Sequence, residues 1–389
     1  MNRVVITGIG IYSCLGTNKQ EVLSSLLRGS CGLSRDEERL VHGFRSSLTG
    51  KLSSPNIPKP LRRFMSQGVE YLYMAAKEAL EDAGDVGRCG VIIGNDSSAK
   101  AMLDASSMLS EFGDTSKLGP THVIKTLSSN PTAVLTSLLP LRGVSFSVGG
   151  ACASGGHAIG VAYNLIKGGV EESILCGGCQ EVNEASVFSF DALGNFSTSE
   201  DPNTAVRPFD SSRCGLVPSG GGACLMLESL THAALRGAKI YGEVIGYGAN
   251  SSGSLAASTV ESEVECMKLA LGSLPYDKID LVSAHATGTQ QGDAIEAMAI
   301  TQVFSHFPYV IATKAMTGHE MWMAGASELI YAILASRAEF IPPNINTEDY
   351  SLDLNIKRNT IEGKTSEFIL SNSFGLGGTN SSIVVKVHL

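Results

Sequence analysis

The chain is built around Ser147-Val-Gly-Gly-Ala-Cys-Ala-Ser-Gly-Gly-His-Ala-Ile-Gly160. Apolar and polar residues alternate over 144–148, which predicts a strand before it. Apolar residues at helical spacing over 159–167 predict a helix after it. Cys152 should therefore lie on a tight turn between a strand end and a helix start. Unpaired N–H groups and the positive end of the helix favour a thiolate there, so we expect the pKa of Cys152 to be lowered. The competing interpretation is a small buried cysteine that fills space at this junction.

Composition limits the class of protein. The chain has 389 residues, of which 43% are hydrophobic, and a net charge of -9. This acidic balance argues against general binding of nucleic acid or anionic membranes. The chain has no apolar run of about 18 residues and no signal peptide, so we expect a cytoplasmic protein without a membrane span. Nine cysteines without a regular spacing indicate free thiols in a reducing compartment.

Strands and helices alternate along most of the chain, which predicts an α/β fold with mainly parallel sheets. Two rounds of this alternation suggest two similar halves, 1–237 and 238–389, and residues 30–60 read as a surface loop. Strands are expected at 3–9, 89–94, 144–148, 172–178, 240–248, 279–284, 310–313, 368–371 and 381–387. Helices are expected at 21–28, 67–83, 130–139, 159–167, 261–271, 295–304 and 324–338, with a helical excursion within 95–120.

Cys176-Gly-Gly-Cys179 has the spacing of a redox or zinc motif. The chain has no second pair of this kind and no histidine pair at zinc spacing. The motif also follows an apolar run, so we interpret it as a strand end packed with small residues rather than as a metal site.

Three further polar segments follow predicted strands. They are His285-Ala-Thr-Gly-Thr-Gln-Gln-Gly-Asp293, Thr313-Lys-Ala-Met-Thr-Gly-His319 and Ser371-Asn-Ser-Phe-Gly-Leu-Gly-Gly-Thr-Asn380. Either histidine alone could be a buried structural residue. Together they lie where open α/β folds build sites, beyond the carboxyl ends of strands. A thiol, two imidazoles and a glycine loop rich in backbone donors suit acyl-thioester chemistry.

These motifs resemble, in order, those of the 3-oxoacyl-[acyl-carrier-protein] synthases, the class I/II beta-ketoacyl synthases of the thiolase-like superfamily. The resemblance rests on Ala151-Cys-Ala-Ser, His285-Ala-Thr-Gly-Thr, Lys314-Ala-Met-Thr-Gly-His and Asn372-Ser-Phe-Gly-Leu-Gly-Gly-Thr-Asn, and it covers nearly the whole chain. It implies a thiolase-like fold, with two pseudo-duplicated halves in a layered α-β-α-β-α arrangement. It also implies an acyltransferase that performs a decarboxylative Claisen condensation and uses no metal or organic cofactor.

The resemblance assigns the catalytic roles. Cys152 would take the acyl chain as a thioester, and its backbone N–H with that of Leu376 would form the oxyanion hole. His285 and His319 would bind the malonyl thioester, promote its decarboxylation and stabilise the enolate. The product would be a 3-oxoacyl thioester two carbons longer.

Supporting roles follow from the same resemblance. Lys314 and Glu328 would form an ion pair around His319, because a buried lysine needs a partner. Thr287 and Thr289 would hydrogen-bond the phosphopantetheine arm of an acyl carrier protein.

The carrier protein is usually acidic, so its docking to an acidic chain requires a local basic patch. Lys59, Arg62 and Arg63 are the first candidates, and Arg207 is a further one; ordinary solvated surface is the alternative for each. The resemblance implies a dimer, either a homodimer or a heterodimer with a related subunit.

Three positions depart from the family pattern. Leu376 stands where a second phenylalanine usually joins Phe374 as a gate over the nucleophile. Trp322 replaces a glycine, so it could shape the site or a subunit contact, and Cys214 replaces an aspartate. These departures favour a specialised synthase, for polyketide or aryl-polyene-like chains, over a housekeeping role in fatty-acid synthesis.

Other classes fit less well. A thiolase needs a second reactive cysteine near its C-terminus, and the last cysteine here is Cys266. The third class of ketoacyl synthases uses Cys-His-Asn, and a hydrolase elbow would need glycine where Ser154 stands. A non-enzymatic chain-length partner subunit is the remaining alternative, and the presence of Cys152, His285 and His319 argues against it.

Overall fold

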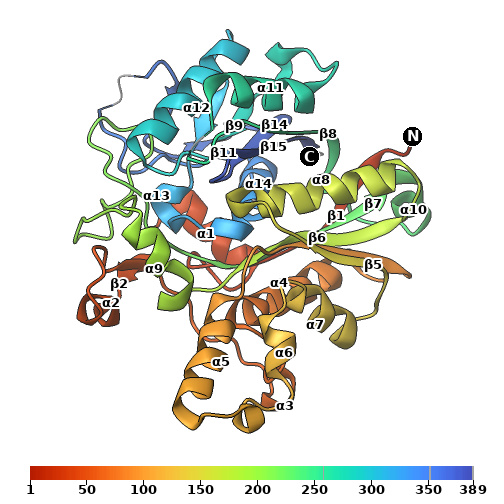
Figure 1. Ribbon diagram of the computed structural model, residues 1–389. Coiled ribbons are helices and arrows are strands. Elements are labelled where there is room, and N and C mark those ends of the chain that lie inside the picture. The colour runs from red at the N-terminus through yellow and green to blue at the C-terminus, as the bar shows by residue number, and fades with distance from the viewer. Residues whose placement is uncertain (257, 350–351, 388–389) are drawn as a thin grey trace.

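The structure is a computed structural model that describes residues 1–256, 258–349 and 352–387. Figure 1 shows five layers, in which helices cover both outer faces and further helices lie between two layers of strands. This arrangement confirms the predicted thiolase-like α/β fold. Within the described segments, no helix has the length and apolarity needed to cross a membrane.

Both strand layers belong to one continuous sheet, because β1 pairs with β7 along its length and with β8 at its start. The strand order is β12-β10-β9-β14-β15-β8-β1-β7-β6-β4-β5. The strands are β1 (Val4–Tyr12), β4 (Cys89–Gly94), β5 (Leu141–Val148), β6 (Ser173–Gln180), β7 (Gly221–Ser229), β8 (Gly242–Ser251), β9 (Leu281–Ser283), β10 (Tyr309–Ile311), β12 (Asn355–Ile356), β14 (Phe368–Phe374) and β15 (Thr379–Val387). Four short strands lie outside this sheet: β2 (Leu33–Arg35) pairs with β3 (Leu48–Gly50), and β11 (Phe340–Ile341) pairs with β13 (Ile361–Glu362).

The expectation of mainly parallel sheets is wrong. Among the described strands of the large sheet, the central pairs β6–β7, β7–β1, β1–β8, β8–β15 and β15–β14 are antiparallel, and only the outer pairs are parallel. The link between β14 and β15 is only residues 375–378, and so short a link joins antiparallel neighbours. The β7 strand, which forms two of these antiparallel pairs, has no counterpart among the predicted strands.

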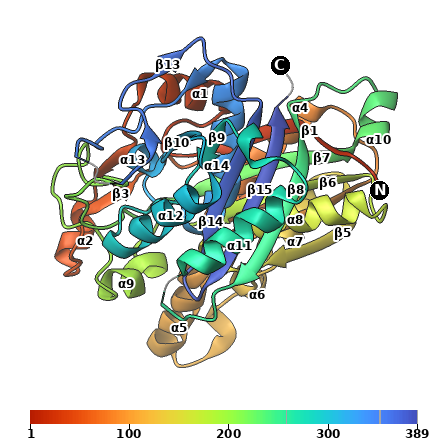
Figure 2. The same cartoon turned by 90° about the horizontal axis from the view of Figure 1, so that it is seen from above.

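The predicted helices are present within about five residues of their expected bounds, whereas shorter ones such as α9 were not predicted. Figure 2 shows α11 and α12 crossing above β14, β15 and β8, whereas α4 packs against β1 and β7 on the opposite outer face. The helices are α1 (Lys19–Arg28), α2 (Glu37–Val41), α3 (Lys59–Arg62), α4 (Gln67–Ala83), α5 (Ala99–Phe112), α6 (His122–Thr126), α7 (Asn130–Leu138), α8 (Ser154–Lys167), α9 (Glu184–Ala192), α10 (Leu230–Leu235), α11 (Val260–Leu271), α12 (Gln290–Val303), α13 (Lys314–Thr317) and α14 (Ala324–Arg337).

The two inner helices, α8 and α14, cross at glycines. A Cβ at Gly325 would lie 2.5 Å from the backbone nitrogen of Gly156, so no larger residue fits at this crossing. The close approach packs the N-terminal ends of both helices against each other. Cys152 precedes α8 and His319 precedes α14, so the crossing brings these two side chains together.

The segment 30–60 was expected to be a loop, and it contains β2, α2, β3 and the first residues of α3. These elements are too short for a periodic pattern to reveal them. Cys176 and Cys179 lie buried in β6, and all nine cysteines are free thiols, as predicted.

Candidate active site

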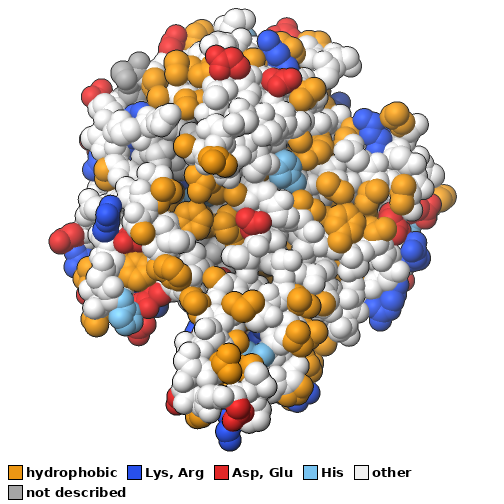
Figure 3. All heavy atoms as spheres, in the orientation of Figure 1, with side chains coloured by type: hydrophobic (Ala, Val, Ile, Leu, Met, Phe, Trp, Pro, Cys, Tyr) orange, Lys and Arg blue, Asp and Glu red, His pale blue; other side chains and the backbone are white. Residues whose placement is uncertain are grey.

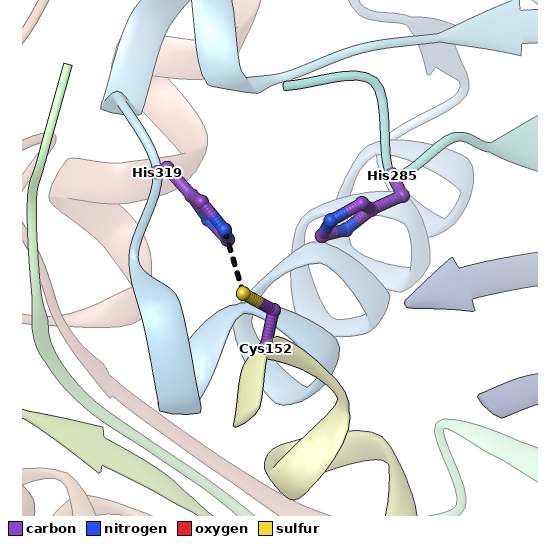
Figure 4. A group of neighbouring side chains, drawn as sticks. All are labelled: Cys152, His285 and His319. Atoms are coloured by element: carbon purple, nitrogen blue, oxygen red, sulfur yellow. Dashed lines mark hydrogen bonds between the residues drawn. The ribbon is translucent and has the colours of Figure 1, made fainter. Parts of the chain in front are cut away.

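Cys152 lies in a single 3-10 turn, Ala151–Ala153, between β5 and α8. Ala151 has a φ of 45°, a strained conformation that turns the chain sharply before the nucleophile. The side chain is buried, and the backbone N–H of Leu376 faces its sulfur. Figure 4 shows Cys152 pointing toward His285 and His319.

His319 faces the sulfur directly. Its Nε2 lies 3.1 Å from Cys152 Sγ. The backbone N–H of His319 donates to the carbonyl of Val217, and the N–H of Ser219 donates to the carbonyl of His319. These two bonds fix the backbone that carries the imidazole. The N–H of Met321 donates to His319 Nδ1 over 3.3 Å. Since Nδ1 accepts, the proton of the neutral ring is assigned to Nε2, which is therefore a donor toward the sulfur.

His285 presents the same tautomer. It follows β9, and its ring meets that of His319 edge-on, with 5.3 Å between centroids. Lys314 Nζ lies 3.3 Å from His285 Nδ1 and can only donate, so the proton of the neutral imidazole is assigned to Nε2. Burial, followed by the nearby Lys314 charge, lowers the pKa of both histidines well below the usual value. Two neutral imidazoles therefore offer N–H donors to one small region.

Lys314 holds His285 in place. Its ammonium contacts the carboxylate of Glu328 and also donates to the backbone carbonyl of His285. Both charged side chains are buried, and burial raises the pKa of Glu328 to about 7 against the opposing effect of Lys314. The pair was expected around His319, but its hydrogen bonds go to His285.

The expectation of a lowered Cys152 pKa is wrong for the unliganded protein. Burial raises the pKa of Cys152 to about 11, although the Leu376 N–H and the Lys314 charge act in the opposite direction. Sequence reasoning found the helix end that favours a thiolate. It did not show how deeply the fold buries the sulfur, which lies at the end of a cavity with only 6% of the residue exposed.

A cavity of about 720 Å³ leads to Cys152, and both histidines line it. Thr287 and Thr289 lie on its wall, with 3.0 Å between their hydroxyl oxygens. Phe374 lines the cavity at the end of β14, edge-on to His285 at 6.2 Å. Leu376, in the β14–β15 turn, is 42% exposed and also lines the cavity.

Trp322 and Cys214 have different positions relative to this cavity. Trp322 is buried behind the wall, where its ring lies 6.1 Å from that of Phe190, a lining residue. Its indole nitrogen is buried without a hydrogen-bond partner among the described residues. Cys214 is exposed and lines the cavity, with its sulfur 3.3 Å from the hydroxyl of Ser197.

The candidate docking residues differ in their surroundings. Arg62 is held by both carboxylate oxygens of Glu70, at 2.7 and 2.6 Å. Lys59 is exposed at the start of α3, and the exposed Arg63 stacks on its neighbouring phenylalanine. The Arg207 side chain bonds to the carbonyl of Thr204. Lys and Arg side chains are spread singly over the face in Figure 3.

Sequence reasoning missed two buried acids that hold the His285 loop. Glu296 accepts the N–H groups of His285 and Ala286 at 2.8 and 2.7 Å, and Asp293 accepts that of Gly288 at 3.0 Å. Asn372 of β14 also donates to Glu296. The sequence carried one signal for them: Asp293 and Glu296 follow the histidine motif directly and are three positions apart, so they share one face of a helix.

The sulfur and the two imidazoles also form a possible metal-ligand set. Among the described residues, one ligand atom each from Cys152, His285 and His319 lies within 4.8 Å of the others. Thiolate and imidazole are ligands that zinc prefers. The same three side chains suit thioester chemistry, which needs no ion.

Family models cover most of the chain. Residues 1–233 match the model described as "Beta-ketoacyl synthase, N-terminal domain", and residues 241–348 match "Beta-ketoacyl synthase, C-terminal domain". The chain belongs to the beta-ketoacyl synthase family.

Several full-length beta-ketoacyl synthases are similar to this one. The "3-oxoacyl-[acyl-carrier-protein] synthase 1" of Haemophilus influenzae is 39% identical, with 99% of each chain covered. The protein of the same name from Escherichia coli strain K12 is 37% identical, also over 99% of each chain. A solved beta-ketoacyl synthase from Burkholderia phymatum has a TM-score of 0.92 at 30% identity, and all of both chains is covered. The solved "ishigamide ketosynthase/chain length factor" has a TM-score of 0.91 at 28% identity, again over all of both chains.

Proposed function

We propose that this beta-ketoacyl synthase elongates an acyl group held on Cys152 by two carbons taken from a malonyl-carrier thioester. The observation that carries the assignment is the meeting of a buried thiol with two imidazole N–H donors at the end of one cavity. The enzyme class rests on the family match and on the full-length relatives named as 3-oxoacyl-[acyl-carrier-protein] synthases. These findings do not favour a non-enzymatic partner subunit.

The first half-reaction transfers the acyl group. Cys152 Sγ attacks the thioester carbonyl, and its proton leaves with the thiol of the released carrier arm. The backbone N–H groups of Cys152 and Leu376 hold the oxyanion of the tetrahedral intermediate. Donors of this kind are each worth about 3 kcal/mol in acyl-transfer sites.

The second half-reaction forms the carbon–carbon bond. The malonyl thioester loses carbon dioxide, and the electron pair moves onto the thioester oxygen as an enolate. His285 and His319 donate their Nε2–H groups to that oxygen. The enolate carbon then attacks the acyl-Cys152 carbonyl and expels the thiolate, which takes up one proton. Lys314, paired with Glu328, keeps Nδ1 of His285 unprotonated and so keeps the donor on the reacting side.

The substrate arm enters through the same cavity. Thr287 and Thr289 hydrogen-bond the phosphopantetheine arm, and Phe374 and Leu376 act as the gate beside Cys152. The acyl carrier protein docks near the exposed Lys59 and Arg63, with Arg207 as a further contact, whereas Arg62 is already paired with Glu70.

The assembly and location follow the family. We infer a cytoplasmic dimer in which each chain contributes the halves 1–237 and 238–389. A homodimer is the simpler assembly, and a heterodimer with a related subunit is the alternative.

Intact-protein mass spectrometry tests the function. The purified chain is mixed with acyl-carrier thioesters of different chain lengths, with and without malonyl-carrier, beside a Cys152→Ala variant. We expect an acyl adduct on the wild type alone, discharged by malonyl-carrier into a product two carbons longer. An adduct that forms equally on Cys152→Ala, or one that malonyl-carrier does not discharge, would refute the proposal.

The same panel decides the pathway. The names of the curated relatives support chain elongation in fatty-acid synthesis. The second candidate, a polyketide or aryl-polyene-like pathway, is favoured by Trp322 and Leu376, which change the surroundings of the nucleophile. Exclusive use of ordinary saturated acyl groups would eliminate this second candidate.

A further inference from the structure

Glu263 is a buried acid on the wall of the substrate cavity. It lies in the first turn of α11, only 2% exposed, and it lines the cavity that ends at Cys152. Ser258, which precedes the same helix, also lines the cavity and faces the Glu263 carboxyl. The proposed reaction uses neither residue.

The Glu263 carboxyl has unused hydrogen-bonding capacity. Its Oε2 is buried and has no hydrogen-bond partner among the described residues. A buried polar atom without a partner costs about 1–3 kcal/mol, so such atoms in native proteins call for an explanation. Because the atom belongs to a residue on the cavity wall, a bound substrate is a natural partner for it.

Its surroundings keep Glu263 uncharged. Burial, with the carboxylates of Glu296 and Asp293 on α12 nearby, raises the pKa of Glu263 to about 10 against the opposing effect of Ser258. At neutral pH the group is therefore a carboxylic acid, with one O–H donor and one carbonyl acceptor. A carboxylate would offer acceptors only.

We propose that Glu263 determines specificity for the thioester arm, by pairing its carboxyl group through hydrogen bonds with a secondary amide of that arm. The inference rests on the proposed function, which brings a phosphopantetheine arm through this cavity. A secondary amide has one N–H donor and one carbonyl acceptor, which complement those of the acid. A hydrocarbon acyl chain offers neither group, so the arm is the part of the substrate that fits.

The position of Glu263 agrees with this partner. The acids that face it, Glu296 and Asp293, accept the backbone N–H groups of the loop that carries Thr287 and Thr289. Glu263 and the two threonines proposed to bind the arm all line the same cavity.

Acylation kinetics with two donors test the proposal. One donor is an acyl-pantetheine, which has amides, and the other is the same acyl group on an amide-free alkanethiol of equal length. We expect Glu263→Leu to raise the KM for acyl-pantetheine about tenfold, the effect of one unpaired buried amide, with a much smaller change in kcat. The KM for the amide-free donor should change less than about twofold.

Two further variants separate hydrogen bonding from packing. Glu263→Gln keeps a donor and an acceptor at this position, so it should recover most of the affinity lost in Glu263→Leu. Glu261→Leu removes an exposed carboxyl from the same helix and serves as the matched control. If Glu263→Leu does not fold, Glu263→Met provides a flexible side chain of similar length for the same comparison.

The outcomes are distinguishable. An equal loss with both donors, or no loss with acyl-pantetheine, would overturn the role of Glu263 while leaving the proposed function intact. A wild-type chain that no donor acylates would overturn the proposed function, and the inference with it.

Discussion

Glu263→Gln should stabilise the protein increasingly as the pH rises. The folded pKa of Glu263 is raised to about 10 from an ordinary value of 4.5. Between these values the folded chain holds a proton that the unfolded chain has released, so stability is full below pH 4.5 and falls as the pH increases. Each pH unit in this window costs the wild type about 1.4 kcal/mol, or about 4 kcal/mol from pH 5.5 to pH 8.5. Glutamine does not titrate and escapes this loss.

The effect can be measured by thermal unfolding at several pH values. An unfolding entropy of about 2.1 cal/mol/K per residue gives about 0.8 kcal/mol/K for 389 residues. The Tm difference between Glu263→Gln and the wild type should therefore grow by about 5 °C from pH 5.5 to pH 8.5. The titratable groups around Glu263 are Asp293 and Glu296 on α12 and Cys266 on its own helix, and both proteins retain them. A Tm difference that is constant with pH, or one that Glu261→Gln reproduces, would refute the reasoning.

Three more predictions concern the catalytic cluster. Lys314→Met leaves the buried Glu328 without its partner and should lower the free energy of unfolding by about 3 kcal/mol, as measured by urea titration. The double variant Lys314→Met/Glu328→Leu removes the unpaired acid as well, so it should recover most of this loss of stability. Because the pKa of Cys152 is raised to about 11, its alkylation by iodoacetamide should speed up about tenfold per pH unit above neutrality, and a plateau near pH 7 would contradict this pKa. Zn²⁺ should bind Cys152, His285 and His319 and slow acylation reversibly; unchanged inhibition in His285→Ala would place the metal elsewhere.

Local patterns predicted most elements of the fold. The strand before Cys152, the glycine-rich turn and helices such as α4 (Gln67–Ala83) lie within a few residues of their expected positions. The direction of strand pairing was not predictable in this way, because the side-chain pattern of a buried strand is the same for parallel and antiparallel neighbours. The central strand β7 (Gly221–Ser229) was missed, because a short apolar run such as Ala223 to Leu227 does not by itself distinguish a strand from another buried segment.

The positions of the candidate site residues were easier to predict than their electrostatics. Cys152, His285 and His319 follow strands or short turns in recognisable motifs, and the structure brings all three to one point. The pKa of Cys152 depends on burial and on segments distant in sequence, because Lys314 and the Leu376 N–H of the β14–β15 turn both act on the sulfur. The spacing of Asp293 and Glu296 indicated two acids on one helix face, but their hydrogen-bond partners become apparent only when α12 packs beneath the His285 loop.

The buried, protonated state of Cys152 has a consequence for oxidative damage. Peroxide attacks thiolates and hardly reacts with thiols, and it must reach the sulfur to form a sulfenic acid. In the resting enzyme Cys152 is a protonated thiol and only 6% exposed, whereas Cys214 is exposed at the cavity wall. An oxidant entering the cavity therefore meets Cys214 first. The nucleophile retains its reduced form until a substrate draws away its proton.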